Sequence, residues 1–333
     1  MRVLITGGCG FIGSNFIRYL LQADPDVQVT NLDALTYAGN LENLRDLDQD
    51  PRYRFLEGKI QDPEIVDLAM EGMDAVVHFA AESHVDRSIQ DAAPFIQTNV
   101  AGAQVLLQKA REHHLPRFLH ISTDEVYGTL GEEGIFTEET PFRPRSPYAA
   151  SKAAADLLAS AYFETYRLPV CIVRPSNNYG PYQFPEKLIP LMVTNLLEEK
   201  KVPVYGQGLN VRDWLFVEDN CRAIDLVLRK GRPGEAYNIG GACEKRNIEV
   251  VHTVLNLLGK GDDAIQFVPD RPGHDFRYAL SNEKIEHELG WRPQIPFSEG
   301  ILRTVEWYQQ HTGWWRALKA RLANESQGFW TKK

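Results

Sequence analysis

The chain has 333 residues, of which 43% are hydrophobic and 24% are charged, and this composition excludes a fibrous or disordered protein. Lysine and arginine total 36 against 45 acidic residues, a formal charge of −9 that disfavours binding to nucleic acid or to an anionic membrane surface. Four cysteines without C-x-x-C spacing, and no apolar run near the roughly 18 residues of a membrane helix, lead us to expect a reduced cytoplasmic protein with no signal peptide and no membrane span.

The first half of the chain alternates short β-branched segments with segments of helical apolar spacing. The expected strands are Arg2–Thr6, Val27–Asp33, Tyr53–Glu57, Ala75–Phe79, Arg117–Thr123 and Val170–Arg174. The expected helices between them are Phe11–Ala23, Pro63–Met70, Pro94–His113 and Tyr148–Arg167. Repeated strand–helix–strand order with buried strands predicts right-handed crossovers and an α/β fold, a doubly wound parallel sheet with helices on both faces.

Beyond about Pro175 the alternation breaks, and loops become longer. Two short strands, Pro203–Tyr205 and Ala236–Ile239, are expected there, with helices at Leu188–Glu199, Glu218–Arg229, Glu249–Leu258 and Phe297–His311. We therefore expect two domains, residues 1–175 and a smaller lobe of residues 176–333, with some elements of the lobe returning to the first domain. The lobe should cover the carboxyl ends of the sheet, where open α/β folds bind ligands.

A glycine-rich turn follows the first expected strand. Gly7, Gly10 and Gly13 satisfy G-x-x-G-x-x-G, and the overlapping G-x-G-x-x-G is present as well. Glycines at this turn let the backbone approach a pyrophosphate, to which the following helix offers its amides. Asp33 ends the second strand 20 residues after Gly13, where a carboxylate accepts hydrogen bonds from a ribose diol and repels a 2′-phosphate. The motif predicts NAD rather than NADP; the alternative is a structural turn with Asp33 as a surface cap.

Two further motifs carry acid–base groups. Tyr148 and Lys152 form Y-x-x-x-K on one helical face, where a nearby ammonium is expected to favour tyrosinate and make the phenol a base. Asp124 and Glu125 follow the fifth strand, at the sheet edge where catalytic groups of such folds lie. The structural alternatives are an amphipathic helix for the first pair, and a helix cap with a solvated neighbour for the second.

Together these residues resemble the extended short-chain dehydrogenase/reductase family and, within it, the dTDP-glucose 4,6-dehydratases. The resemblance covers nearly the whole chain. It is carried by Thr6–Gly13, Leu35–Asn40, Ala80–Asp86, Ser122–Gly128, Arg174–Pro181, Arg212–Trp214, Tyr237–Gly240 and Asp270–Asp275. Related epimerases share the glycines and Y-x-x-x-K but usually carry small residues in place of Asp124 and Glu125.

The resemblance implies a Rossmann domain that binds NAD, a lobe that binds a nucleotide sugar, and a reaction in three steps. Tyr148, tuned by Lys152 and hydrogen-bonded to Thr123, would take the proton of the sugar 4-hydroxyl as hydride passes from C4 to NAD. Glu125 would then remove the C5 proton while Asp124 protonates the departing 6-hydroxyl, and hydride would return to C6.

The same resemblance implies two binding sets. The cofactor set comprises Gly7, Gly10, Phe11, Ile12, Gly13, Asp33, Leu35, Thr36, Gly39, Ile60, Phe79, Ala80, Ala81, Ser83, Thr98, Tyr148, Lys152 and Asn178. The substrate set comprises Ser83, Thr123, Asn177, Lys187, Leu188, Pro203, Val204, Tyr205, Arg212, Asn247, Asp270, Arg271 and His274. One departure is Lys59, which stands where the family usually has an aspartate that meets the adenine amino group; lysine has no acceptor for that amine, so the adenine contact must differ.

The partners expected are a nucleotide sugar and a second copy of the chain, which would form a homodimer through the helices near Pro94–His113 and Tyr148–Arg167. Glu82, His84 and Asp86 alternate as metal ligands can, but no second cluster completes a site, so no metal is expected. Two other functions stay open, a nucleotide-sugar 4-epimerase and a non-catalytic NAD-binding regulatory protein. The sequence does not choose between thymine and uracil nucleotides.

Overall fold

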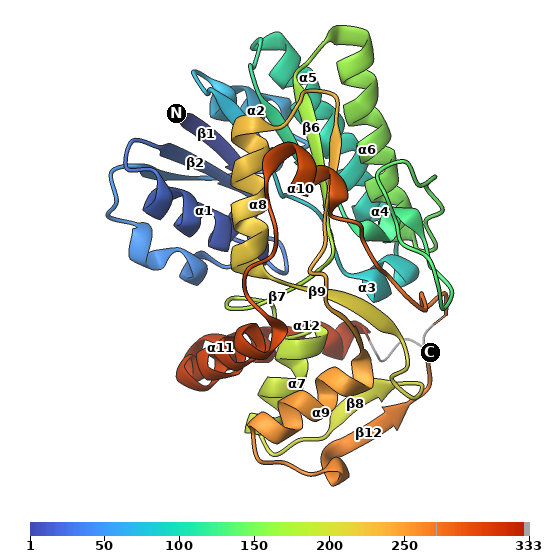
Figure 1. Cartoon of the computed structure of the whole chain (residues 1–333). Coiled ribbons are helices and arrows are strands. Elements are labelled where there is room, and N and C mark those ends of the chain that lie inside the picture. Colours follow the sequence, from blue (N-terminus) through green and yellow to red (C-terminus); the bar gives the residue numbers. More distant parts are fainter. Residues whose placement is uncertain (271, 330–333) are drawn as a thin grey trace.

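The computed structural model describes the backbone of residues 1–270 and 272–329, and side chains up to residue 323. Its centre is a parallel sheet of seven strands in the order β10-β6-β5-β4-β1-β2-β3 (Figure 1). The strands are β1 (Arg2–Thr6), β2 (Gln28–Asp33), β3 (Tyr53–Glu57), β4 (Ala75–His78), β5 (Phe118–Ile121), β6 (Val170–Pro175) and β10 (Ala236–Ile239). The order reverses direction between β1 and β4, so the predicted doubly wound sheet is confirmed.

Helices cover both faces of this sheet, because consecutive strand residues are apolar. Val3 and Ile5 belong to the core under one set of helices, whereas Leu4 between them belongs to the core on the opposite face. The first face carries α1 (Phe11–Ala23) and α8 (Val217–Lys230), and the other carries α2 (Pro63–Met70), α5 (Ala103–Glu112) and α6 (Pro147–Tyr166).

The segment expected as one helix over Pro94–His113 is divided. It consists of α4 (Ala93–Phe95), a π-helical stretch η3 (Ile96–Gly102) and α5. Within the wider π turn, the Asn99 side chain accepts from Glu82 N at 2.8 Å and donates to Ser151 Oγ at 2.9 Å. These bonds tie the loop after β4 to α6, and π turns of this kind recur where a side chain serves a site.

The smaller lobe lies at the carboxyl ends of the strands (Figure 1). It contains a three-stranded sheet in the order β11-β9-β7 and a two-stranded parallel sheet of β8 and β12. Its elements are β7 (Asn177–Tyr179), α7 (Leu188–Leu197), β8 (Val202–Tyr205), β9 (Val211–Phe216), β11 (Glu244–Arg246), α9 (Asn247–Leu257), β12 (Ile265–Val268), α11 (Phe297–Gln310) and α12 (Thr312–Phe329). The remaining short elements are η1 (Leu41–Asn43), η2 (Arg45–Leu47), α3 (Val85–Gln90), η4 (Asp124–Tyr127), η5 (Asp262–Ala264) and α10 (Glu283–Leu289).

Two elements beyond residue 175 return to the main sheet. β10 pairs with β6, with Asn238 opposite Arg174, and α8 packs beside α1. The sequence placed the Ala236–Ile239 strand and the Glu218–Arg229 helix with the smaller lobe, although it allowed that some elements return. Pairing between strands about 60 residues apart leaves no local signal in the sequence. The sequence therefore could not show which elements return to the main sheet.

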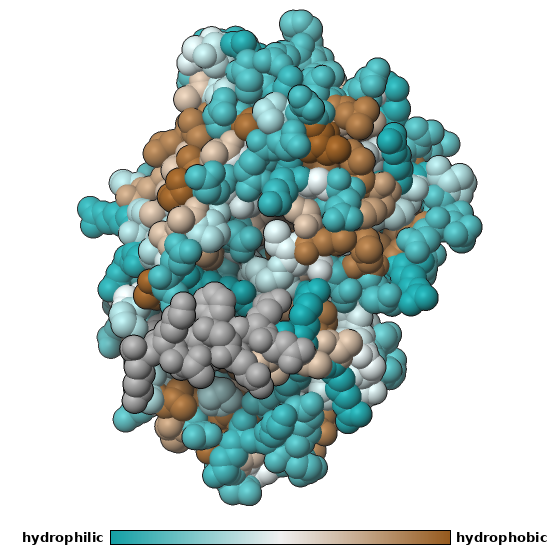
Figure 2. Space-filling view, turned by 180° about the vertical axis from the view of Figure 1, so that it is seen from behind, coloured by the Kyte–Doolittle hydropathy of each residue, from teal (hydrophilic) through white to brown (hydrophobic). Residues whose placement is uncertain are grey.

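Hydrophilic residues predominate on the face seen in Figure 2, where hydrophobic residues form separate patches. Among the described helices, none combines the length and apolarity that a membrane crossing requires.

Candidate active site

A cavity of about 550 Å³ opens at the carboxyl ends of the central strands. Six loops line it, those that follow β1, β2, β3, β4, β5 and β6. Most residues of the predicted cofactor set lie on its wall: Gly7, Gly10, Phe11, Ile12, Gly13, Asp33, Thr36, Gly39, Ile60, Phe79, Ala80, Ala81, Ser83, Thr98, Tyr148, Lys152 and Asn178. Lys59, the departure from the family pattern, also lines it.

The glycine turn leaves no room for side chains. A Cβ on Gly7, whose φ is +74°, would lie 2.6 Å from Ala80 N, and one on Gly13 would lie 2.4 Å from the Gly7 carbonyl oxygen. The backbone therefore packs against the loop after β4 and against itself. Helix α1 begins at Phe11, and its N-cap Gly10 offers no side-chain cap, so the first amides of the helix keep their capacity to bind an anion in the cavity.

Asp33 ends β2 and is fixed by two backbone amides. Its carboxylate accepts from Cys9 N at 2.8 Å and from Leu35 N at 2.8 Å. Burial raises the pKa of this carboxyl, and the two amide hydrogen bonds act in the opposite direction. Leu35 itself does not line the cavity, but its N–H orients Asp33.

Tyr148 and Lys152 are both buried and both line the cavity. Lys152 Nζ donates to the Ile121 carbonyl oxygen at 2.6 Å, and burial lowers the pKa of this ammonium to about 8, opposed by Asp156. Burial raises the pKa of Tyr148 well above its usual value, with Glu125 adding and a hydrogen bond with Thr123 opposing. The Y-x-x-x-K spacing does not reveal this desolvation of the phenol, which is the largest contribution to the shift in pKa.

Asp124 and Glu125 lie on η4, a single 3₁₀ turn that begins after Thr123. The Thr123 hydroxyl donates to Asp124 Oδ1 at 3.1 Å and accepts from Glu125 N at 3.3 Å. Asp124 is 3% exposed, and its Oδ2 has no hydrogen-bond partner among the described residues. Burial, with Glu125 adding, raises the pKa of Asp124 well above its usual value, so the site favours the neutral form of this carboxyl beside a more open neighbour.

The predicted substrate set divides into two groups. Ser83, Thr123, Asn177 and Lys187 line the cavity. Lys187 Nζ donates to the Ser83 carbonyl oxygen at 3.0 Å, and Asn177 Oδ1 is buried without a partner in the described part of the chain. An unpaired buried acceptor on a cavity wall can accept a hydrogen bond from a ligand.

The other substrate residues lie outside the cavity, in the smaller lobe. Tyr205 at the end of β8 meets the ring of His274 at 6.0 Å between centroids, and His274 Nδ1 lies 2.6 Å from Asp270 Oδ1. This outer group comprises Leu188, Pro203, Val204, Tyr205, Asn247, Asp270 and His274. Arg271 lies outside the described residues.

Arg212, which the resemblance implies for a diphosphate, lies away from the cavity wall. Its guanidinium is buried, donates to the Val211 and Asp275 carbonyl oxygens at 2.8 and 3.0 Å, and lies 4.5 Å from the centre of the Tyr278 ring. It does not line the cavity, and its contact with a diphosphate stays a prediction.

Sequence reasoning assigned no cavity role to several lining residues. Glu82 and Ser176 lie within quoted motifs, whereas Gln97, Gln183 and Phe184 lie in segments without one. It also missed the polar side chains behind the wall, which only the packing of distant elements brings together. Among the side chains that the structure describes, no group of three or more from His, Cys, Asp or Glu could hold a metal ion.

Comparison with known proteins agrees with this geometry. The family model described as GDP-mannose 4,6 dehydratase matches residues 4–304. A dTDP-glucose 4,6-dehydratase of Streptomyces niveus is 54% identical over 324 residues, 96% of each chain. The chain belongs to the dTDP-glucose 4,6-dehydratase family.

Further members of this family and its epimerase relatives share the fold. A dTDP-glucose 4,6-dehydratase of Xanthomonas campestris pv. campestris strain B100 is 52% identical over 331 residues, 93% of this chain and 94% of that one. The structure of the Streptomyces venezuelae dTDP-glucose 4,6-dehydratase DesIV, solved with NAD bound, matches with a TM-score of 0.94 and 55% identity over 96% of this chain and 100% of that one. A Thermus thermophilus UDP-glucose 4-epimerase in complex with NAD reaches 0.86 at 33% identity, over 93% of this chain and 100% of that one.

Proposed function

We propose that this chain catalyses the NAD-dependent dehydration of dTDP-glucose to dTDP-4-keto-6-deoxyglucose, a hydro-lyase reaction of deoxysugar biosynthesis. The observation that carries the proposal is the carboxyl pair of Asp124 and Glu125 in one cavity with Tyr148 and Lys152. Oxidation at C4 needs one base, and loss of water across C5 and C6 needs a second base and an acid. A 4-epimerase needs only the first.

The residues present fit NAD. The glycine turn excludes any Cβ at Gly7 and Gly13, the start of α1 offers amides for a pyrophosphate, and Asp33 retains lone pairs for a ribose diol. When bound, NAD supplies the acceptor for the hydride that leaves C4 and the donor of the hydride that reaches C6.

Tyr148 is the base for the 4-hydroxyl. Its raised pKa means that the phenol is neutral at rest, and the hydrogen bond with Thr123 acts in the opposite direction, toward the phenolate. We propose that the Lys152 ammonium also stabilises the phenolate, because charges within a buried site act with little screening.

Asp124 and Glu125 divide the elimination between them. Asp124, whose neutral form burial favours, gives its proton to the departing 6-hydroxyl. Glu125 takes the proton from C5, which the ketone at C4 has made acidic. The two adjacent carboxyls can have opposite roles because Asp124 is buried whereas Glu125 is half-buried.

The binding roles follow the two groups of substrate residues. We propose that residues 1–175, with β10 and α8, bind NAD, and that residues 176–333 bind the nucleotide, with the outer group around Tyr205 and His274 at the base. We also propose a cytoplasmic homodimer formed through α5 and α6. Leu157, an apolar side chain of α6 that is 62% exposed, supports that interface.

Incubation with dTDP-glucose tests the reaction. A base-sensitive keto chromophore is expected, and deuterium placed on C4 should appear on C6 of the same molecule. A galactose-configured product would favour the epimerase, and no product would favour a binding protein. Rates with dTDP-, UDP- and GDP-glucose would show which base the outer group accepts.

A further inference from the structure

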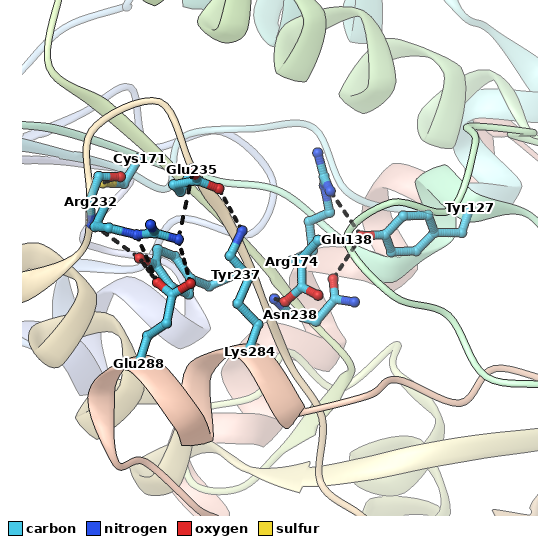
Figure 3. A network of polar contacts seen from close by, with 10 residues as sticks. All are labelled: Tyr127, Glu138, Cys171, Arg174, Arg232, Glu235, Tyr237, Asn238, Lys284 and Glu288. Carbon is cyan, nitrogen blue, oxygen red and sulfur yellow. Dashed lines mark hydrogen bonds and ion pairs between the residues drawn. The ribbon is translucent and has the colours of Figure 1, made fainter.

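A buried polar network lies behind the turn that carries Asp124 and Glu125. The Arg174 guanidinium donates from Nε to Asp156 Oδ2 at 2.8 Å and from Nη1 to the Tyr127 hydroxyl at 2.8 Å. The Tyr127 hydroxyl donates in turn to Asn238 Oδ1 at 2.7 Å. Figure 3 shows Arg174 and Asn238 meeting Tyr127 at its hydroxyl end. None of these side chains lines the cavity.

Every hydrogen bond around Tyr127 has one possible direction. Arginine has no acceptor, so the Tyr127 oxygen must accept from Arg174 and its hydrogen must go to Asn238. Asn238 is itself held, because its backbone N donates to Glu138 Oε1 at 2.8 Å and its Nδ2 donates to the Phe136 carbonyl oxygen at 3.3 Å. These hydrogen bonds therefore fix the position of the Tyr127 ring. Tyr127 follows Glu125 by two residues in the chain.

The other end of the network reaches the helix of Tyr148 and Lys152. Asp156 follows Lys152 by one turn of α6 and is fully buried. Its second oxygen, Oδ1, lies 3.3 Å from His120 Nε2. Burial alone would raise the pKa of Asp156, but the contact with His120 and the Arg174 charge hold it at about 2, so the pair with Arg174 stays ionised at neutral pH.

We propose that Arg174 is a positioning residue for the dehydration, which joins Asp156 on the helix of Tyr148 and Lys152 to Tyr127 on the turn of Asp124 and Glu125. The inference rests on the proposed function. The base that oxidises C4 and the acid pair that expels water come from different elements, α6 and η4, and must meet the same sugar ring. The Arg174 guanidinium donates one hydrogen bond to each of these two elements.

Stability alone does not account for such a pair. A buried ion pair is often replaceable by apolar residues without loss of stability, whereas it fixes the relative position of the groups that it joins. Arginine suits this role because its donors are rigidly spaced, so both partners are held at once.

Substitution of Tyr127 by phenylalanine tests the link. Tyr127→Phe keeps the ring packing and the Arg174–Asp156 pair. It removes the hydrogen bonds that join η4, the turn of Asp124 and Glu125, to Arg174 and Asn238. We expect elimination to slow by about ten-fold, because both hydrogen bonds of the Tyr127 hydroxyl are lost, while C4 oxidation stays within about two-fold. Reduced nicotinamide should then accumulate during turnover, and kcat should fall with little change in KM.

A matched control is available one residue from Asn238. The Tyr237 hydroxyl donates to Glu288 Oε2 at 2.9 Å, in the separate network of Arg232 and Lys284 that Figure 3 also shows. Tyr237→Phe loses a hydroxyl from an equally buried ring on β10 and should keep both steps at wild-type rates. The two variants should have similar melting temperatures.

Arg174→Lys extends the test, since one ammonium cannot hold both Asp156 and Tyr127. It should accumulate reduced nicotinamide as Tyr127→Phe does; if it fails to fold, Tyr127→Phe decides alone. The proposal is overturned if Tyr127→Phe matches Tyr237→Phe, or if oxidation and elimination fall together. Wild-type protein that makes no keto sugar would refute the proposed function, and with it the step that Arg174 serves.

Discussion

Adjacent carboxyls differ in this site because the backbone turn sends them into different surroundings. η4 places Asp124 in the buried wall of the cavity, where it keeps an unpartnered oxygen, and leaves Glu125 half-buried. The sequence could mark both residues but not their difference, because burial of Asp124 depends on distant elements. The same limit applies to Tyr148, whose desolvation no local spacing reveals.

Substitution of each carboxyl should block a different half of the elimination. Asp124→Asn is expected to slow loss of the 6-hydroxyl by about 10²-fold or more, the usual contribution of a general acid, while the C5 proton still exchanges with deuterated solvent. Glu125→Gln should abolish that exchange. Mass spectrometry of the sugar recovered from deuterium oxide distinguishes the two, and equal exchange in both variants would contradict the assignment.

The buried Lys152 ammonium should lower the stability of the folded chain, although it serves catalysis. Its pKa falls from 10.5 to about 8 on folding, so between these values the unfolded chain binds more protons and stability rises with pH. Below pH 8 the full loss of stability from burying the charged Lys152 is present. Lys152→Met should therefore be inactive yet more stable at pH 7, by on the order of 2 kcal/mol after loss of the Ile121 hydrogen bond.

Denaturant unfolding at pH 7 and near pH 10 would check this prediction, with the wild-type chain as reference. The advantage of Lys152→Met should shrink as the pH approaches 10.5. An advantage that did not depend on pH would point to packing rather than to the buried charge.

At the scale of elements, regular strands and helices were predictable and irregular ones were not. β1, β3 and β10, and helices α1 and α2, begin and end at the expected residues, because apolar runs and caps are local signals. The Asp62 cap of α2, which accepts from Glu64 N at 3.0 Å, is one of these. The π turn at Ile96–Gly102 depends instead on Asn99 reaching Glu82 and Ser151, contacts that no local pattern encodes.

The junction of β1 and α1 should be sensitive to a single methyl group. In Gly13→Ala the new Cβ would meet the Gly7 carbonyl oxygen at 2.4 Å, so α1 must move away from the strand. We expect NAD affinity to fall at least about ten-fold and stability to fall by about 1–3 kcal/mol.

Calorimetric titration of the apoprotein with NAD would measure this change in affinity. Gly131→Ala is the control, because a Cβ there meets nothing within 4 Å and its φ is not positive. If both variants bound NAD alike, the close packing of the turn would not be what shapes the pyrophosphate site.

At the scale of the whole molecule, the C-terminal helix links the two lobes. The Trp314 indole donates to Asn43 Oδ1 at 2.9 Å, and the Arg321 guanidinium donates to the Tyr37 carbonyl oxygen. Both acceptors lie near Thr36 and Gly39, on the loop that follows β2. These contacts join α12 to the loop that lines the cavity through Thr36 and Gly39.

The proposed homodimer can be tested on α6. Leu157→Glu places a charge where an apolar side chain is 62% exposed, and burying that charge in an interface would be unfavourable. We expect the variant to sediment as a monomer where the wild type sediments as a dimer. Leu68→Glu, at a residue of α2 that is 52% exposed, should leave the assembly unchanged.

The seventh strand has a consequence for synthesis on the ribosome. Asn238 emerges more than 100 residues after Tyr127, so a nascent chain can complete the glycine turn and α1 long before the last support of the acid turn exists. A chain halted before residue 236 would lack the Asn238 partner of the Tyr127 hydroxyl, so the position of its water-expelling groups would be fixed only late in translation.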